Sequence, residues 1–299
     1  MASVIHHEML TLGCSFHIER VVTLNAIYTP FLTHENLVRC MRLQPLDNKN
    51  SQLMCGLWPM VGHMNNACTF NVALVAFGDM LVVRATEDIA AGTELCRPYF
   101  SRDQSFQDTS QMLLEQYGIT CHCLVCEETR ATEPRLLAKR QSLIGDTKGL
   151  SEKRGITAAV CKGFVTELTK TYRRPPTEVP REAVSDIQHT AAALEMENGR
   201  LSSAITWAFD CLASMGFVIQ GGGADGCRAR QRASRGPMVI QQWGRMIVWV
   251  FDCWVILERA FALQGALELA AQAREYAKIS YSLCVGEDES FDKAFPRIF

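Results

Sequence analysis

A cluster of three cysteines is the sequence feature that most constrains how this chain folds. The stretch YGITCHCLVC places Cys121, Cys123 and Cys126 within six positions. Residues two apart in an extended or turning segment point the same way, and a C-x-x-C turn brings a third thiolate back to them. Such a set supplies three corners of the tetrahedron that zinc prefers. Three buried, reduced cysteines without a metal are the alternative interpretation, and His122 is expected to point away.

Composition excludes several classes of protein. The chain has 299 residues, 48% hydrophobic and 21% charged, with a net charge of −2, so it is expected to fold and to bind neither nucleic acid directly nor an acidic membrane surface. No apolar run reaches the roughly 18 residues of a membrane span. The 13 cysteines form an odd number, and no signal peptide is recognised. An intracellular protein, nuclear or cytoplasmic, is predicted.

The pattern up to about residue 100 is typical of strands and turns. A β-branched run at 17–28 indicates a strand, and 45–51 indicates a loop. Residues 71–100 predict a strand, a Gly-Asp turn, a second strand, a turn at Ala-Ala-Gly and a short third strand. Residues 108–118 predict a short helix that stops at Gly118.

From about residue 133 onward the periodicity is helical, with breaks at 173–180 and 220–237. The second break is rich in glycine and arginine and is interpreted as a mobile, solvated linker rather than a nucleic-acid contact. Residues 183–219 and 240–284 predict long helices in pairs, with 248–266 antiparallel to 267–285. Small residues recur at helix-packing positions there, a pattern that is typical of helical hairpins of the tetratricopeptide type. The predicted fold class is α+β.

Three motifs, read in order, resemble a known family. Asn65, Cys68 and Asn71 lie in GLWPMVGHMNNACTFN, GDMLVVRATEDIAAGTELCRPY follows and ends at Tyr99, and the cysteine cluster comes after Tyr117 and Gly118. This order resembles the C-terminal half of a SET domain with its cysteine-rich post-SET segment, as in SMYD proteins and fungal proteins that combine tetratricopeptide repeats with a SET domain. The resemblance covers roughly residues 17–128. It predicts a β-rich partial SET domain with a post-SET zinc segment at 1–128 and an all-α, tetratricopeptide-like region at 129–299.

The resemblance also implies the fourth zinc ligand. In the family, the cysteine of the Asn-His-Ser-Cys element joins the post-SET trio, and Cys68 holds that position here. The expected ligand set is Cys68, Cys121, Cys123 and Cys126 around one structural zinc. The metal would hold Tyr117 and Ile119 over a cofactor pocket.

The activity implied by the resemblance is transfer of a methyl group from S-adenosyl-L-methionine to a lysine of a protein substrate, histone or non-histone. Tyr99 is the expected catalytic residue, and Tyr117 is the second aromatic wall. The expected cofactor-binding residues are Asn25, Asn65, Asn66, Tyr117 and Ile119.

The chain departs from the family pattern at several of these positions. Asn66 replaces the family histidine, Ala67 the serine and Phe70 the proline, and Ile119 stands where a phenylalanine is expected. A SET domain begins with strands that carry a G-x-G turn, but only about sixteen residues precede the first matched strand. The match is therefore interpreted as a SET domain that begins partway through or has diverged, and weak cofactor binding is expected.

Two functions follow from these observations. The first is a SET-type lysine methyltransferase-like protein with eroded motifs. The alternative is a catalytically silent, zinc-stabilised interaction module whose helical half binds a protein partner.

Overall fold

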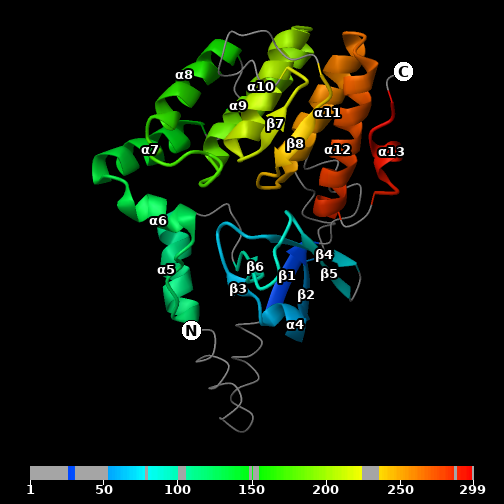
Figure 1. Ribbon diagram of the computed structural model, residues 1–299. Coiled ribbons are helices and arrows are strands. Elements are labelled where there is room, and N and C mark those ends of the chain that lie inside the picture. The colour runs from blue at the N-terminus through cyan, green and yellow to red at the C-terminus, as the bar shows by residue number, and fades with distance from the viewer. Residues whose placement is uncertain are drawn as a thin grey trace. The chain divides into compact units, whose positions relative to one another are not determined.

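The computed structural model describes residues 26–30, 53–77, 80–99, 106–147, 150, 155–223, 236–285 and 288–297. The chain divides into two compact units, Met1–Cys126 and Glu127–Phe299, which are coloured blue to green and green to red in Figure 1. Asn25, the loop expected at 45–51 and most of the strand expected at 17–28 lie outside the described residues. Each unit is described by itself.

The described strands of the first unit form three separate two-stranded sheets. β1 (Ala26–Pro30) pairs with β2 (Leu53–Leu57), and β4 (Val72–Phe77) pairs with β5 (Met80–Ala85), both antiparallel. The short helix α4 (Pro59–Gly62) follows β2. The register of the second pair runs from Val72 opposite Ala85 to Phe77 opposite Met80, which confirms the two predicted strands. Gly78 and Asp79, the predicted turn between them, lie outside the described residues.

The third predicted strand pairs differently from a simple hairpin continuation. It is only two residues long, β6 (Cys96–Arg97), and it lies parallel to β3 (Asn65–Asn66). Asn71 fixes this arrangement, because its Nδ2 donates to the Glu94 carbonyl at 2.9 Å and its Oδ1 accepts from the Cys96 amide at 2.9 Å. Side-chain bonds to the backbone therefore replace a longer ladder here.

Two helices flank the cysteine cluster. α5 (Phe106–Tyr117) ends at Gly118, whose φ of +66° is the left-handed conformation that glycine adopts without strain. The Gly118 amide donates to the Leu114 carbonyl at 3.0 Å and closes the helix. This confirms the predicted helix and its stop. α6 (Leu124–Ala131) then begins within the cluster, and the boundary between the units falls inside it.

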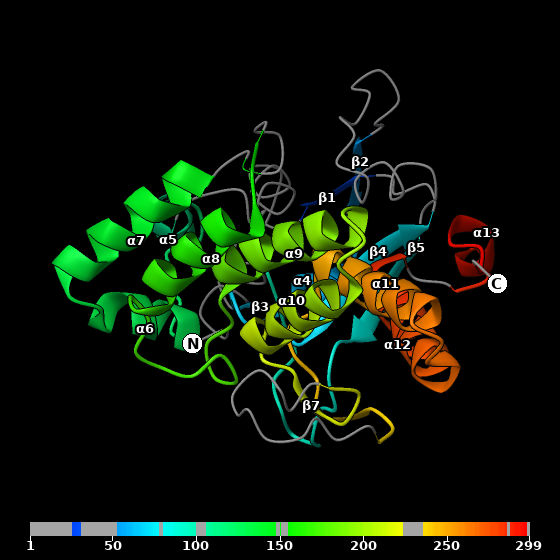
Figure 2. The ribbon, with the colours of Figure 1, turned by 90° about the horizontal axis from the view of Figure 1, so that it is seen from above.

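The second unit is a row of helices, each packed on the next along the chain from α7 to α12 (Figures 1 and 2). The helices are α7 (Pro134–Thr147), α8 (Ala158–Thr169), α9 (Glu182–Glu197), α10 (Leu201–Ser214), α11 (Val248–Leu263), α12 (Leu267–Val285) and the short α13 (Phe291–Ala294). The side chain of Thr157 caps α8 by accepting from the Val160 amide. No helix in the described part of the chain combines the length and apolar character that a membrane crossing requires.

The helical pair expected at 248–266 and 267–285 is confirmed by α11 and α12. The prediction of helix over all of 183–219 and 240–284 was wrong at the inner ends. β7 (Val218–Gln220) and β8 (Val239–Gln242) pair antiparallel there, because Gly216, with φ +96°, ends the preceding helical run and β-branched residues follow. Residues 224–235 of the expected linker lie outside the described residues.

The core of the second unit is built from large side chains. Trp254 and Phe251 on α11 and Tyr281 on α12 are fully buried, and Phe251 contacts Phe291 of α13 edge to face with ring centroids 6.0 Å apart. The mixture of helices and small sheets agrees with the predicted presence of both α and β structure. The SET-type and tetratricopeptide-like arrangements stay predictions.

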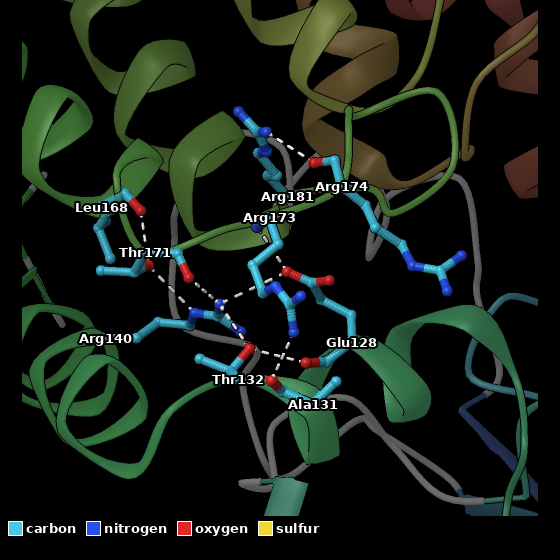
Figure 3. Close-up of polar contacts among 9 residues, drawn as sticks. All are labelled: Glu128, Ala131, Thr132, Arg140, Leu168, Thr171, Arg173, Arg174 and Arg181. Carbon is cyan, nitrogen blue, oxygen red and sulfur yellow. Dashed lines mark hydrogen bonds and ion pairs between the residues drawn. The ribbon is translucent and has the colours of Figure 1, made fainter.

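Buried polar groups at the start of the second unit are also well paired. The guanidinium of Arg140 on α7 lies among Glu128, Thr132 and Thr171 (Figure 3). Its Nε donates to the Thr171 hydroxyl at 3.1 Å, its Nη2 lies 4.0 Å from the Glu128 carboxylate, and it stacks on the ring of Tyr172 at 4.0 Å. This network joins α6, α7 and the segment after α8.

Candidate functional site

The structure brings the four predicted metal ligands together. Cys68 follows β3, Cys121 and Cys123 lie between α5 and α6, and Cys126 is on α6. Their sulfur atoms all lie within 4.8 Å of one another, and those of Cys68 and Cys126 are 3.5 Å apart. A tetrahedron with Zn–S bonds of about 2.3 Å has sulfur–sulfur edges of roughly 3.8 Å, so the donor set fits zinc. His122 is exposed and is not part of this group.

The four thiols are partly buried and interact with one another through hydrogen bonds. A hydrogen bond with Cys121 lowers the pKa of the Cys123 thiol, and a bond with the same residue raises the pKa of Cys126. Cys121 and Cys126 are buried, while Cys68 and Cys123 are half-buried. Because metal ligands must be thiolates, a metal ion that binds here would release the remaining protons.

Two tyrosines pack against this cluster. Tyr99 follows β6 and Tyr117 ends α5, and their rings lie 4.8 Å apart at 51°. Both contact a small core of Leu113, Cys121 and Cys126, as does Ile119. The Tyr99 hydroxyl donates to the Met64 carbonyl at 2.9 Å. Burial raises the pKa of both hydroxyls, against the opposing charge of Arg97, so both are protonated near neutral pH.

The two asparagines of β3 have different surroundings. The side-chain amide of Asn65 donates to the Glu94 carboxylate. Asn66 accepts from the Tyr99 backbone amide at 3.0 Å through Oδ1, and its buried Nδ2 has no hydrogen-bond partner among the described residues. A buried donor without an acceptor is costly, so this atom fits a ligand that brings one. Asn25, the remaining predicted cofactor residue, lies outside the described residues.

Sequence reasoning missed Arg97 at this site. Its guanidinium is buried and stacks on the Tyr99 ring, with its central carbon 4.5 Å from the ring centroid. Burial lowers the pKa of Arg97, which means that its surroundings do not compensate its charge fully. The available signal was its position two residues before Tyr99, at the end of the short strand β6.

Comparisons with known proteins agree with the motifs. The chain is 26% identical over 286 residues to a protein of Gibberella zeae named methyltransferase, an alignment that covers 93% of this chain and 38% of the relative. It is 29% identical over 104 residues to N-lysine methyltransferase SMYD2-A of Xenopus laevis, which is 35% of this chain and 24% of the relative. It is 32% identical over 72 residues to human histone-lysine N-methyltransferase SMYD3, or 24% of this chain and 17% of the relative.

These similarities confirm the predicted resemblance to SMYD-type proteins. No protein-family model matches the chain. The chain spans 38% of the length of the fungal relative and less of the two SMYD relatives, so their activities are not transferred to it as findings.

Proposed function

We propose that the chain is a protein-lysine methyltransferase-like protein of the SET type that uses S-adenosylmethionine and is stabilised by a structural zinc. The observation that carries the proposal is the placement of the Tyr99 and Tyr117 rings side by side, packed against the cysteine cluster. Asn66, whose Oδ1 accepts from the Tyr99 amide, has a buried Nδ2 without a partner among the described residues. The methyltransferase and SMYD names of the similar proteins support the proposal.

The zinc has a structural role in this proposal. Cys68, Cys121, Cys123 and Cys126 would complete its coordination, which leaves no position for a reacting group. Its effect on function is indirect. By fixing the segment between α5 and α6 it would hold Tyr117 and Ile119 in place, because both pack against the cysteine core.

The residues around Tyr99 fit the cofactor. The free donor of Asn66 suits an acceptor on the cofactor, and Tyr117 and Ile119 offer an apolar surface. When bound, S-adenosylmethionine supplies the methyl group. The hydroxyl proton of Tyr99 is committed to the Met64 carbonyl, so the Tyr99 oxygen can only accept from a substrate amine. That bond would orient a neutral amine, and the surrounding rings would exclude water.

A second candidate, the silent zinc-stabilised interaction module, is favoured by one departure. Asn66 stands in the position of the family histidine and uses its only acceptor, Oδ1, on the Tyr99 amide. It therefore offers only the N–H donors of Nδ2, where an imidazole would add stacking area and a second ring nitrogen. In this reading the helical unit binds a protein partner and the Tyr99 region only stabilises the fold.

Calorimetry with S-adenosylhomocysteine and a radiolabelled methyl-transfer assay on histone and non-histone proteins test the proposal. We expect weak binding, and transfer that falls at least about tenfold in Tyr99→Phe while binding persists, because one oriented hydrogen bond is lost. Tyr276→Phe is the matched control, since its hydroxyl also donates to a backbone carbonyl, that of Met238, in the other unit. Binding without any transfer would favour the silent module. A rate of methyl transfer that is unchanged in Tyr99→Phe would refute the catalytic role of Tyr99.

A further inference from the structure

The connection between α8 and α9 carries the sequence Arg-Arg-Pro-Pro-Thr at 173–177. It continues into a tight turn, because the Val179 amide donates to the Pro175 carbonyl at 3.0 Å. The Val179 side chain is 1% exposed, and the Thr177 carbonyl accepts from Nε2 of Gln242 at 3.3 Å. These contacts hold the backbone of the turn on the helical unit, while Thr177 itself is exposed.

The hydroxyl of Thr177 differs from those of the other exposed threonines in the described part of the helical unit. The hydroxyls of Thr166 and Thr206 donate to carbonyls one turn back in their helices, and that of Thr157 caps α8. The Thr177 hydroxyl has no hydrogen-bond partner among the described residues. It is therefore open to an enzyme that modifies surface turns.

An arginine lies close to this hydroxyl. Arg174 forms an ion pair with Glu178 at 3.3 Å, the spacing of one helical turn, and residues three apart on such a turn are also neighbours. Arg174 and Thr177 have that separation. The Arg174 side chain is 39% exposed, and Figure 3 shows that its guanidinium points away from the buried group around Arg140. A partner with negative charge can therefore reach Arg174 and Thr177 together.

We propose that Thr177 is a phosphorylation site for a protein kinase that selects basic residues before its target, with Arg174 as the main recognition residue. In the transfer, the Thr177 hydroxyl oxygen bonds to the γ-phosphorus of ATP, and the bond from that phosphorus to the β–γ bridging oxygen breaks. ADP leaves, and the hydroxyl proton passes to a base of the kinase. Arg174 then pairs with the new phosphate in place of Glu178, because phosphate accepts bidentate, charge-assisted hydrogen bonds. The inference is independent of the proposed function.

A second hydroxyl with basic residues before it shows what the fold adds to the sequence. Lys139 and Arg140 precede Ser142 by three and two positions. Ser142 lies inside α7, however, and Arg140 is 6% exposed and donates to Thr171. A kinase binds its target segment in an extended form, and a surface turn opens to that form at lower cost than the interior of a packed helix. We therefore expect modification at Thr177 and not at Ser142.

The full chain, incubated with magnesium ATP and a protein kinase that selects basic residues two to four positions before the hydroxyl, tests the site by tandem mass spectrometry. A phosphate on Thr177 is expected. Thr177→Val should lack it and should keep the wild-type melting temperature, because the hydroxyl makes no bond that could be lost. Arg174→Gln should lower the rate of modification about ten- to a hundredfold, the range for a hydrogen bond to a charged group. An unmodified Thr177 in the wild type, or an unchanged rate in Arg174→Gln, overturns the inference.

Free peptides of residues 136–147 and 170–181 separate the effect of the fold from that of the sequence. The kinase should modify both peptides, at Ser142 and at Thr177, but only Thr177 in the folded chain. Modification of Thr177 in its peptide and not in the folded chain would show that the turn is closed to the kinase, which overturns the inference. Equal modification of Ser142 and Thr177 in the folded chain also overturns it, because the exposure of the turn would then make no difference.

Discussion

The two units of the molecule bury very different kinds of surface. In the described part of the first unit, six short strands form three separate pairs, and Leu113 is the one large side chain that is fully buried. The second unit buries large side chains throughout its row of helices, among them Trp254, Tyr281, Phe251 and Leu257. An isolated pair of strands is marginal in water, whereas packed amphipathic helices provide their own core.

The difference teaches where each unit obtains its stability. The cysteine cluster of the first unit brings together segments 53 or more positions apart in the chain, because Cys68 meets Cys121, Cys123 and Cys126 there. A metal ion bound by these cysteines would stabilise the first unit, as the burial of apolar side chains stabilises the second. The predictions below test this contrast.

The largest effect is expected from Cys68→Ser. The substitution should release the zinc and unfold the region around Tyr99 and Tyr117, since structural zinc contributes on the order of 10 kcal/mol to folding. The helical unit should keep its far-UV circular dichroism. Elemental analysis and near-UV circular dichroism measure the two outcomes.

The control is Cys96→Ser, a half-buried thiol close to the cluster but outside the group of four. It should keep one zinc per chain. Absence of zinc from wild-type protein purified without a chelator would contradict the metal site.

A second effect should appear in the helical unit alone. Leu257 on α11 is fully buried, so Leu257→Ala should lower the free energy of unfolding of that unit by about 2–5 kcal/mol through the cavity it leaves. Leu263→Ala on the same helix, where the side chain is 48% exposed, should cost much less. Urea unfolding followed by far-UV circular dichroism gives both values. A matching loss of zinc in Leu257→Ala would show that the units are not independently stabilised.

A third test uses pH. Burial alone would lower the pKa of His189, but its 2.5 Å hydrogen bond to Asp252 and the charge of that residue raise the pKa from 6.5 to about 9. Because the folded state holds this proton more tightly, the stabilisation is complete below about pH 6.5 and is lost as pH rises through about 9. The loss amounts to roughly 3 kcal/mol at most.

Asp186 and Cys253 also face His189. The pH measurement therefore needs a variant that removes only the charge of Asp252, the hydrogen-bonding partner of His189. Asp252→Asn should flatten the dependence of the urea midpoint on pH over this window. An equally steep dependence in Asp252→Asn would assign it to other groups.

Sequence patterns predicted local elements well where one residue decides the outcome. Gly118 ends α5 as expected, and the two strand-like runs on either side of the Gly-Asp pair at 78–79 predicted β4 and β5. The convergence of Cys68 with the later cysteines followed from the family motif, and the structure brings the four sulfur atoms together. Whether they bind zinc stays a prediction.

The features that sequence reasoning missed depend on contacts between distant segments. The pairing of β7 with β8 joins Val218 to Gln242 across a long connection, and no periodicity within either strand predicts it. Arg97 carries no motif, and its burial against Tyr99 depends on the parallel pairing of β6 with β3. Residue patterns describe a local surface, whereas burial of a charge is set by what covers it.

The smallest effect should have opposite signs in the two units. Gly118 has φ +66° and no atom within 4 Å of the position a Cβ would take, so Gly118→Ala is strained only through its backbone, by about 1 kcal/mol. Gly163 lies inside α8, is not among the glycines with positive φ, and has equally open surroundings. Gly163→Ala should therefore raise the stability of the helical unit by about 0.5–1 kcal/mol, because alanine loses less backbone entropy in a helix. Urea unfolding monitored separately by near-UV and far-UV circular dichroism resolves the two signs. If both substitutions stabilise the protein, the left-handed conformation of Gly118 at the end of α5 is not needed to position Tyr117.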